Sequence, residues 1–153
     1  MRSETVEKAL FMDCDFASRI DYELKRAERY RVFLSLAIFN LGPIIDLADN
    51  GSFETEKDRS DFVNSVHELI KHSVREVDAV SNSGNVKVGI LLPETPRQAA
   101  ESTINRLSGT IQKFCSDYFR NGNSYLIPIE ISSFPDAAGT KSISSYIDEF
   151  KNM

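Results

Sequence analysis

Residues 78–93 constrain the fold of this chain most strongly, because they contain two short β segments with a turn between them. Asp78 to Asn82 and Val86 to Leu92 have the length of strands, and Ser83-Gly84-Asn85 separates them. Three residues are a usual length for a hairpin connection, and glycine tolerates the positive φ angle that such a turn often needs. The sequence therefore predicts a β-hairpin at Gly84.

Helices and further strands surround this hairpin in a regular order. Apolar residues recur at helical spacing from Phe16 to Ala27, and Thr55 followed by Asp58 is typical of a capping box that opens a helix. Pro96 suits the first turn of another helix. The predicted elements are a helix at 16–27, a strand at 34–41, a helix at 55–74, the hairpin, a helix at 96–114, a strand at 125–134 and a short helix at 142–150.

Two prolines help to place the strands. Gly42-Pro43 is expected to stop any helix, so the apolar run 34–41 before it is predicted to be a buried central strand. Pro128 cannot donate a backbone hydrogen bond, so its strand is expected at an edge or a bulge. The order of elements predicts an α/β (α+β) domain in which helices flank a central mixed β-sheet.

Composition excludes several functional classes. No apolar run approaches the ~20 residues of a spanning helix, so membrane insertion is not expected, and the absence of a secretory signal predicts a cytoplasmic location. A net charge of −5 argues against nonspecific binding to nucleic acid, which needs a basic face. Two distant cysteines indicate neither disulfides nor zinc. His67 and His72 lie five residues apart and are expected to be exposed rather than to bind metal.

The hairpin and its surroundings resemble the GGDEF domain of diguanylate cyclases. Counted back from Leu91-Leu92-Pro93, the family's five-residue signature falls on residues 84–88, which read Gly-Asn-Val-Lys-Val. Residues 16–30 resemble the first helix of the family, 34–41 its first strand and 131–135 its late strand. The resemblance implies one GGDEF-type domain, related to the palm of nucleotidyl cyclases, at residues 16–153. Residues 1–15 are predicted to be a helical lead-in.

The residues that carry cyclase chemistry in this family are replaced. Diguanylate cyclases use carboxylates to hold divalent metal ions against GTP. The four corresponding positions are Asn40, Gly42, Val86 and Lys87. A lysine repels a cation, and Ile45 and Ala48 replace the family's nucleotide-binding lysine and asparagine. The resemblance therefore implies a degenerate domain with no catalytic residues, no metal site and no cofactor, and Mg²⁺ would matter only if the chain were an active cyclase with rearranged ligands.

A second site of the family has its residues in place. Many members carry R-x-x-D five residues before the signature, as an inhibitory site for the product cyclic di-GMP. This chain has Arg75 and Asp78 at that spacing, and a further arginine of the site falls on Arg106. Arginine forks suit guanine and phosphate, and Asp78 would accept from the guanine N–H edge. The same residues could instead serve a helix end, a turn and an exposed surface.

These observations predict a catalytically inactive GGDEF-like signalling domain of bacterial type that binds cyclic di-GMP as a receptor or regulatory module. Two alternatives remain. One is a protein-interaction scaffold that uses a protein partner or a homodimer and no nucleotide. An exposed apolar stripe at Val6, Leu10 and Phe11, together with a filled R-x-x-D pocket, would favour it. The other is an active diguanylate cyclase that converts GTP to cyclic di-GMP.

Overall fold

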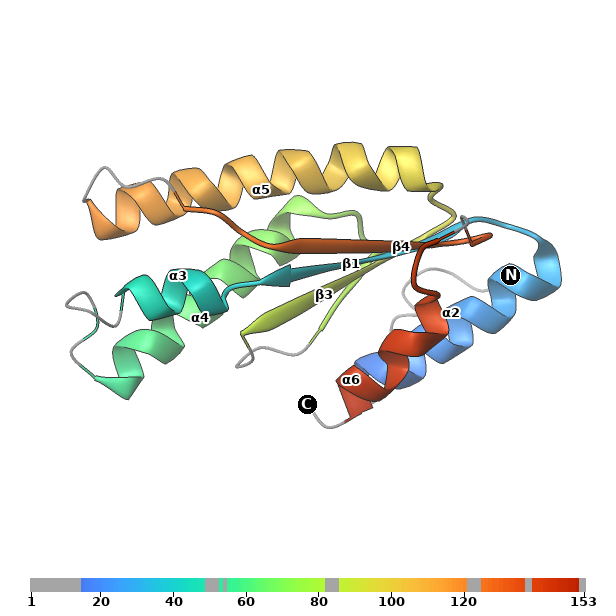
Figure 1. Ribbon diagram of the computed structural model, residues 1–153, viewed down its shortest axis with the longest axis horizontal. Helices are drawn as coiled ribbons and strands as arrows, with labels where there is room; N and C mark the ends of the chain where they lie inside the picture. Colours follow the sequence, from blue (N-terminus) through green and yellow to red (C-terminus); the bar gives the residue numbers. More distant parts are fainter. Residues whose placement is uncertain are drawn as a thin grey trace.

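The structure, a computed structural model, describes residues 15–48, 53, 55–81, 86–120, 125–136 and 139–151 (Figure 1). The predicted helical lead-in at residues 1–15 falls almost entirely outside the described residues, as does the hairpin tip Ser83-Gly84-Asn85. No helix in the described part of the chain is long and apolar enough to cross a membrane.

Four strands form one sheet in the order β2-β3-β1-β4. Their bounds are Leu34–Asn40 for β1, Ala79–Val80 for β2, Lys87–Pro93 for β3 and Ile129–Phe134 for β4. The central position predicted for β1 and the edge position predicted for the Pro128 strand are both confirmed. Pro128 lies just before β4, and its carbonyl still accepts a hydrogen bond from the Asn40 N–H at 3.0 Å.

Every pair of neighbouring strands described is antiparallel, so the expected mixed sheet is wrong in this respect. The helical crossover from β1 does bring β2 back in the direction of β1. The hairpin, confirmed by the pairing of Ala79 with Leu91 and Val80 with Ile90, then inserts β3 between these two strands. The parallel pair that a crossover would create is therefore absent, as in split β-α-β folds of the ferredoxin type.

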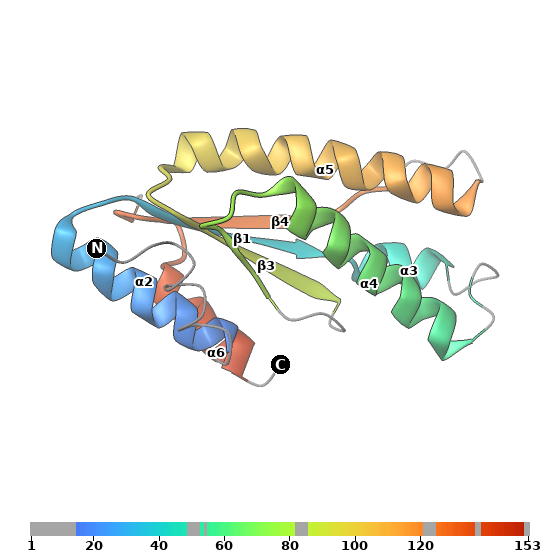
Figure 2. The same cartoon turned by 180° about the vertical axis from the view of Figure 1, so that it is seen from behind.

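Helices cover both faces of the sheet. On one face lie α4 and α5, and on the other lie α2 and α6 (Figures 1 and 2). Because strand residues alternate, Ala37 and Phe39 join the core under α4 and α5, whereas Leu36 and Ile38 join the core under α2. The bounds are α2 Phe16–Tyr30, α3 Gly42–Ala48, α4 Glu56–Ser73, α5 Arg97–Phe119, the 3₁₀ helix η1 Ile143–Tyr146 and α6 Ile147–Lys151.

Side-chain caps explain where the helices begin. The Asp15 carboxylate accepts a hydrogen bond from the Ser18 N–H at 2.7 Å and caps α2, and this bond lowers the pKa of Asp15. The predicted capping box of α4 is present: the Thr55 hydroxyl accepts from the Asp58 N–H at 3.2 Å, and the Asp58 carboxylate accepts from the Thr55 N–H at 3.3 Å. Pro96 occupies the N-cap of α5.

Two local expectations are wrong. Gly42-Pro43 does not stop a helix but begins the short helix α3, because proline fits a first helical turn and the next two residues of the helix, Ile44 and Ile45, are fully buried. The expected exposure of His67 is also wrong, since this residue is buried on the apolar face of α4, while His72 near the end of that helix is exposed.

An aromatic pair joins the two ends of the described chain over β3. Phe16 of α2 and Phe150 of α6 meet edge to face with ring centroids 4.7 Å apart. Both rings lie directly above Gly89, where an added Cβ would be 2.6 Å from one ring and 2.7 Å from the other. The glycine therefore allows α2 and α6 to approach the sheet.

We expect Gly89→Ala to lower the free energy of unfolding by about 1–3 kcal/mol, because the new methyl group displaces two buried rings. Urea denaturation measures this change. Gly109→Ala is a matched control, since nothing lies within 4 Å of its Cβ position in the middle of α5. That substitution should stabilise the protein by about 0.5–1 kcal/mol. Equal effects of the two substitutions would contradict the packing described for Gly89.

Candidate functional site

The turn between α4 and β2 positions Arg75 and Asp78. It is closed by a hydrogen bond from the Asp78 N–H to the Arg75 carbonyl at 3.0 Å. The Asp78 carboxylate accepts in return from the Arg75 N–H at 2.8 Å. These two hydrogen bonds both involve a backbone N–H, so they hold the turn in place independently of the ion pair between the two side chains.

The guanidinium of Arg75 is bound to its own chain. Its Nη2 lies 2.8 Å from Oδ1 of Asp78, and its Nε lies 3.2 Å from both carboxylate oxygens. Nη2 also lies 2.8 Å from the Thr95 hydroxyl and 3.1 Å from the Pro93 carbonyl. The side chain of Asp78 is 2% exposed, whereas that of Arg75 is 55% exposed. Arg75 is therefore held at its inner edge and open to solvent at its outer edge.

Arg106 approaches the same region from α5. Its Nη2 donates to the Ser73 carbonyl at 3.3 Å, at the C-terminal end of α4, where a positive charge is favourable. The residue is otherwise exposed. Because this long hydrogen bond is the one that the described part of the chain gives to the Arg106 side chain, Arg106 is freer to reorient than Arg75.

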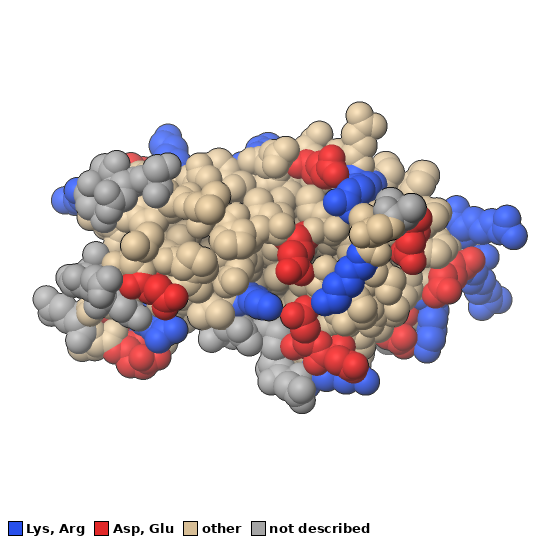
Figure 3. Space-filling model, viewed as in Figure 1, with Lys and Arg blue, Asp and Glu red and all other residues tan. Residues whose placement is uncertain are grey.

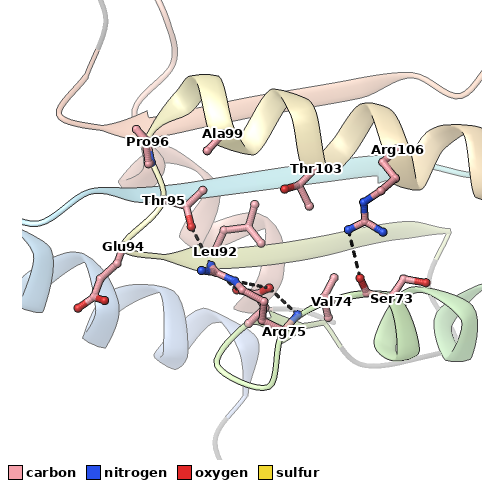
Figure 4. Close-up of a pocket in the computed structure, with 11 residues that line it drawn as sticks. Ser73, Val74, Arg75, Leu92, Glu94, Thr95, Pro96, Ala99, Thr103 and Arg106 are labelled. Carbon is pink, nitrogen blue, oxygen red and sulfur yellow. Dashed lines mark hydrogen bonds and ion pairs between the residues drawn. The ribbon is translucent and has the colours of Figure 1, made fainter.

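One pocket of about 430 Å³ brings together all three predicted site residues, Arg75, Asp78 and Arg106 (Figure 4). Its walls come from the end of α4, the turn after it, the end of β3 and the first turns of α5. The two arginines lie on either side of Val74, and Thr103 of α5 faces the space between them (Figure 4). The pocket is open rather than filled by side chains. Its lining carries two cations, Arg75 and Arg106, two carboxylates, Asp78 and Glu94, and several hydroxyls.

The role expected for Asp78 differs from its observed position. The sequence suggests that it accepts hydrogen bonds from a guanine edge. In the structure its carboxylate is almost fully covered, and both oxygens accept from Arg75. Asp78 therefore orients Arg75 here rather than presenting a free acceptor.

Sequence reasoning missed Thr95 and Glu94 as parts of this site. Thr95 bonds Arg75 across 20 residues, and no local pattern signals such a contact. Glu94 has a positive φ of 53° and forms an ion pair with Arg26 of α2 at 3.0 Å. A left-handed conformation at a residue other than glycine is uncommon and can mark a functional segment. In Figure 4 the Glu94 side chain turns away from the two arginines of the pocket.

The opposite end of β3 carries the positions at which the sequence resemblance places metal ligands. Asn40 lies directly across from Lys87 in the β1–β3 register, about 20 Å from Pro93 for a strand of this length. The Asn40 side-chain oxygen accepts from the Gly42 N–H at 2.9 Å, and Lys87 forms an ion pair with Glu149 of α6 at 3.3 Å. Among the described residues, no group of three or more His, Cys, Asp or Glu could hold a metal ion.

Comparison with known proteins shows the fold. No protein-family model matches the sequence, and a search of curated proteins finds no match. The GGEEF domain of a diguanylate cyclase from Vibrio cholerae superposes with a TM-score of 0.66 at 15% identity, over 88% of this chain and 82% of that one. The GGDEF domain of DgcB from Caulobacter crescentus, solved with c-di-GMP, gives 0.65 at 12% identity, over 90% of this chain and 78% of that one.

A third structure, the diguanylate cyclase SiaD from Pseudomonas aeruginosa in complex with its activator SiaC, gives a TM-score of 0.55 at 17% identity. It covers 89% of this chain and 50% of that one. Together with the sheet order and the two helical layers, these matches establish that the chain has the fold of GGDEF diguanylate cyclase domains. The fold expected from the sequence resemblance is therefore confirmed.

Proposed function

We propose that this chain is a catalytically inactive GGDEF-like signalling domain that binds cyclic di-GMP through Arg75, Asp78 and Arg106. The observation that carries the proposal is the shared pocket of these three residues. Their spacing in the sequence predicts a common site, and they line one open hollow of about 430 Å³. Related support comes from the DgcB GGDEF domain, which was solved in complex with c-di-GMP.

The pocket chemistry suits a dianionic ligand with guanine edges. A guanidinium can donate paired hydrogen bonds to phosphate oxygens or to guanine O6 and N7. Within the described part of the chain, the hydrogen bonds of the Arg75 guanidinium use Nε and Nη2, so Nη1 can face a ligand without breaking the bonds to Asp78 and Thr95. Arg106 contributes a second cation with one weak tether. The carboxylates of Asp78 and Glu94 also line the pocket, so its formal charges balance, and an anionic ligand would be recognised by the directed donors of the two arginines.

Charged side chains elsewhere support recognition at a local site. On the face seen in Figure 3, most of the acidic and basic side chains lie toward the end that carries α2 and α6, and the two signs are interspersed. Such a face offers no broad cationic field for nonspecific attraction of polyanions. An anionic ligand would depend on specific arginines, as the pocket provides.

Loss of cyclase activity is supported by the residues at the other end of β3. A divalent cation needs oxygen ligands with negative charge, but Asn40 is neutral and its oxygen accepts from the Gly42 N–H. Lys87 places a cation opposite Asn40 and is paired with Glu149. These residues do not fit the divalent metal site of the family, so we propose that the domain needs no Mg²⁺.

Binding of a protein partner without nucleotide is the second candidate. It is favoured by the engagement of Arg75 within its own chain, which a purely structural arginine would also show. The SiaD structure contains an activator protein, SiaC, bound to that cyclase. The apolar residues Val6, Leu10 and Phe11, proposed for such a contact, lie outside the described residues.

Isothermal titration with cyclic di-GMP tests the binding proposal. We expect saturable heat with the wild-type chain and a roughly 10- to 100-fold weaker Kd for Arg106→Ala, because a hydrogen bond to a charged group contributes about 1.5–3 kcal/mol. Arg106 is the residue of choice because, among the described residues, its removal breaks a single hydrogen bond of 3.3 Å, to the Ser73 carbonyl.

Lys113→Ala is the matched control, since it removes an exposed cation two turns further along α5, outside the pocket. Its Kd should equal that of the wild type. An absence of heat with the wild-type chain, or equal Kd values for all three proteins, would contradict cyclic di-GMP binding at this pocket.

Incubation with GTP tests the proposed loss of catalysis. We expect no cyclic di-GMP with either Mg²⁺ or Mn²⁺, because Asn40 and Lys87 cannot replace two metal-binding carboxylates. Chromatography of the nucleotides after prolonged incubation measures this directly. Product above the level of an enzyme-free blank would show that the domain is an active cyclase with rearranged ligands.

A further inference from the structure

Three buried residues with hydroxyl groups form a connected set that runs from β4 through β1 to the pocket. Ser35 of β1 is 0% exposed, and Ser133 of β4 and Thr95 are each 6% exposed. Ser35 and Ser133 are register partners, and their hydroxyl oxygens are 2.8 Å apart. The Ser35 hydroxyl also lies 2.7 Å from the Thr95 carbonyl. Buried polar groups are costly unless they are bonded, so this connected set needs a structural reason.

The direction of each hydrogen bond follows from counting protons. A serine hydroxyl has one hydrogen, and Ser35 must donate it to the Thr95 carbonyl, which can only accept. Ser133 is therefore the donor to Ser35. In the same way the Thr95 hydroxyl donates to the Pro93 carbonyl at 2.9 Å. Its oxygen then presents only lone pairs to the neighbouring Arg75.

This set of hydrogen bonds ends at Arg75, which bonds to Thr95. Its Nη2 donates to the Thr95 hydroxyl at 2.8 Å, on the side of the guanidinium that faces the protein. The Thr95 backbone is fixed through its carbonyl by Ser35, and the Thr95 hydroxyl is oriented by Pro93. An arginine has several rotatable bonds, and ordering it only when a ligand arrives would reduce affinity. Asp78 supplies charge at one edge of the guanidinium. Thr95 supplies a second fixed point (Figure 4).

We propose that Thr95 is a positioning residue of the pocket, which, supported by Ser35 and Ser133 across the sheet, holds the Arg75 guanidinium in the orientation that receives an anionic ligand. This role rests on the proposed binding of cyclic di-GMP for its functional consequence. The effect of Thr95 on the orientation of Arg75 in the unliganded protein is a separate part of the proposal and can be measured directly.

Thr95→Val and Thr95→Ser test the proposal by isothermal titration with cyclic di-GMP. Valine keeps the shape of threonine without the hydroxyl, and serine keeps the hydroxyl. We expect Thr95→Val to weaken the Kd about 10-fold or more, because a bond to a charged donor is lost, and Thr95→Ser to stay within about 3-fold of the wild type. Ser65→Ala, which removes a hydroxyl bonded to the Asp61 carbonyl on α4 outside the pocket, is the matched control and should leave the Kd unchanged. Thermal unfolding of each variant confirms that it is folded.

A second measurement separates this proposal from the binding proposal. The side-chain Nε–H resonance of Arg75, assigned by its loss in Arg75→Lys, reports the position of the guanidinium without ligand. We expect the same shift and slow exchange with water in the wild type and Thr95→Ser, and a changed shift with faster exchange in Thr95→Val.

An unchanged Arg75 resonance in folded Thr95→Val overturns the positioning role, whatever the titrations show. A changed resonance together with an unaltered Kd would show that the positioning of Arg75 by Thr95 does not contribute to ligand binding. If the wild-type chain gives no heat with cyclic di-GMP, the proposed function fails, and the Arg75 resonance alone then decides whether Thr95 positions this arginine.

Discussion

The antiparallel pairing of β1 with β3 is the interaction on which every other feature of the molecule depends. It sets Leu34 opposite Pro93 at one end and Asn40 opposite Lys87 at the other. The first end carries the pocket, and the second carries Asn40 and Lys87, the positions at which the sequence resemblance places metal ligands. Because β1 and β3 are buried on both faces, a slip of one residue would turn their side chains to the wrong layers. The register therefore fixes where both candidate sites can lie.

Local signals in the sequence are sufficient for most elements. Helical periodicity and capping residues predict α2 and α4, and the apolar run before Gly42 predicts β1. The misses depend on contacts that no local pattern contains. Helix α3 exists because Ile44 and Ile45 find a buried surface, which outweighs the usual interpretation of Gly-Pro as a break. The sheet is antiparallel because the hairpin places β3 between β2 and β1.

Some features of the candidate site are likewise predictable from the sequence, and others depend on contacts between distant segments. Family spacing groups Arg75, Asp78 and Arg106, and the structure places them around one pocket. Spacing does not reveal that Asp78 is covered and bonded to Arg75, since that depends on how the turn after α4 closes. Nor can it reveal Thr95, which reaches Arg75 only because Ser35 of β1 anchors the segment that leaves β3. The grouping of these three residues is predictable from their spacing, whereas the separate roles that we propose for them depend on three-dimensional contacts.

The two ends of β3 both bear on the function that we propose for the domain. At Lys87 the strand carries a cation paired with Glu149 of α6, at a position where the sequence resemblance implies a carboxylate. At Pro93 it leads into a segment that helps to hold Arg75 at the rim of an open pocket. These two ends are the basis for our proposal that the domain senses a nucleotide rather than making one.

A crystal structure of the domain grown with cyclic di-GMP is the most direct test of this interpretation. The predicted result is ligand density in the pocket, with a guanine edge or phosphate bonded to Arg75 and Arg106 and with Asp78 still bonded to Arg75. Ligand at the Asn40 and Lys87 end of β3, or an empty pocket at saturating concentration of ligand, would contradict it.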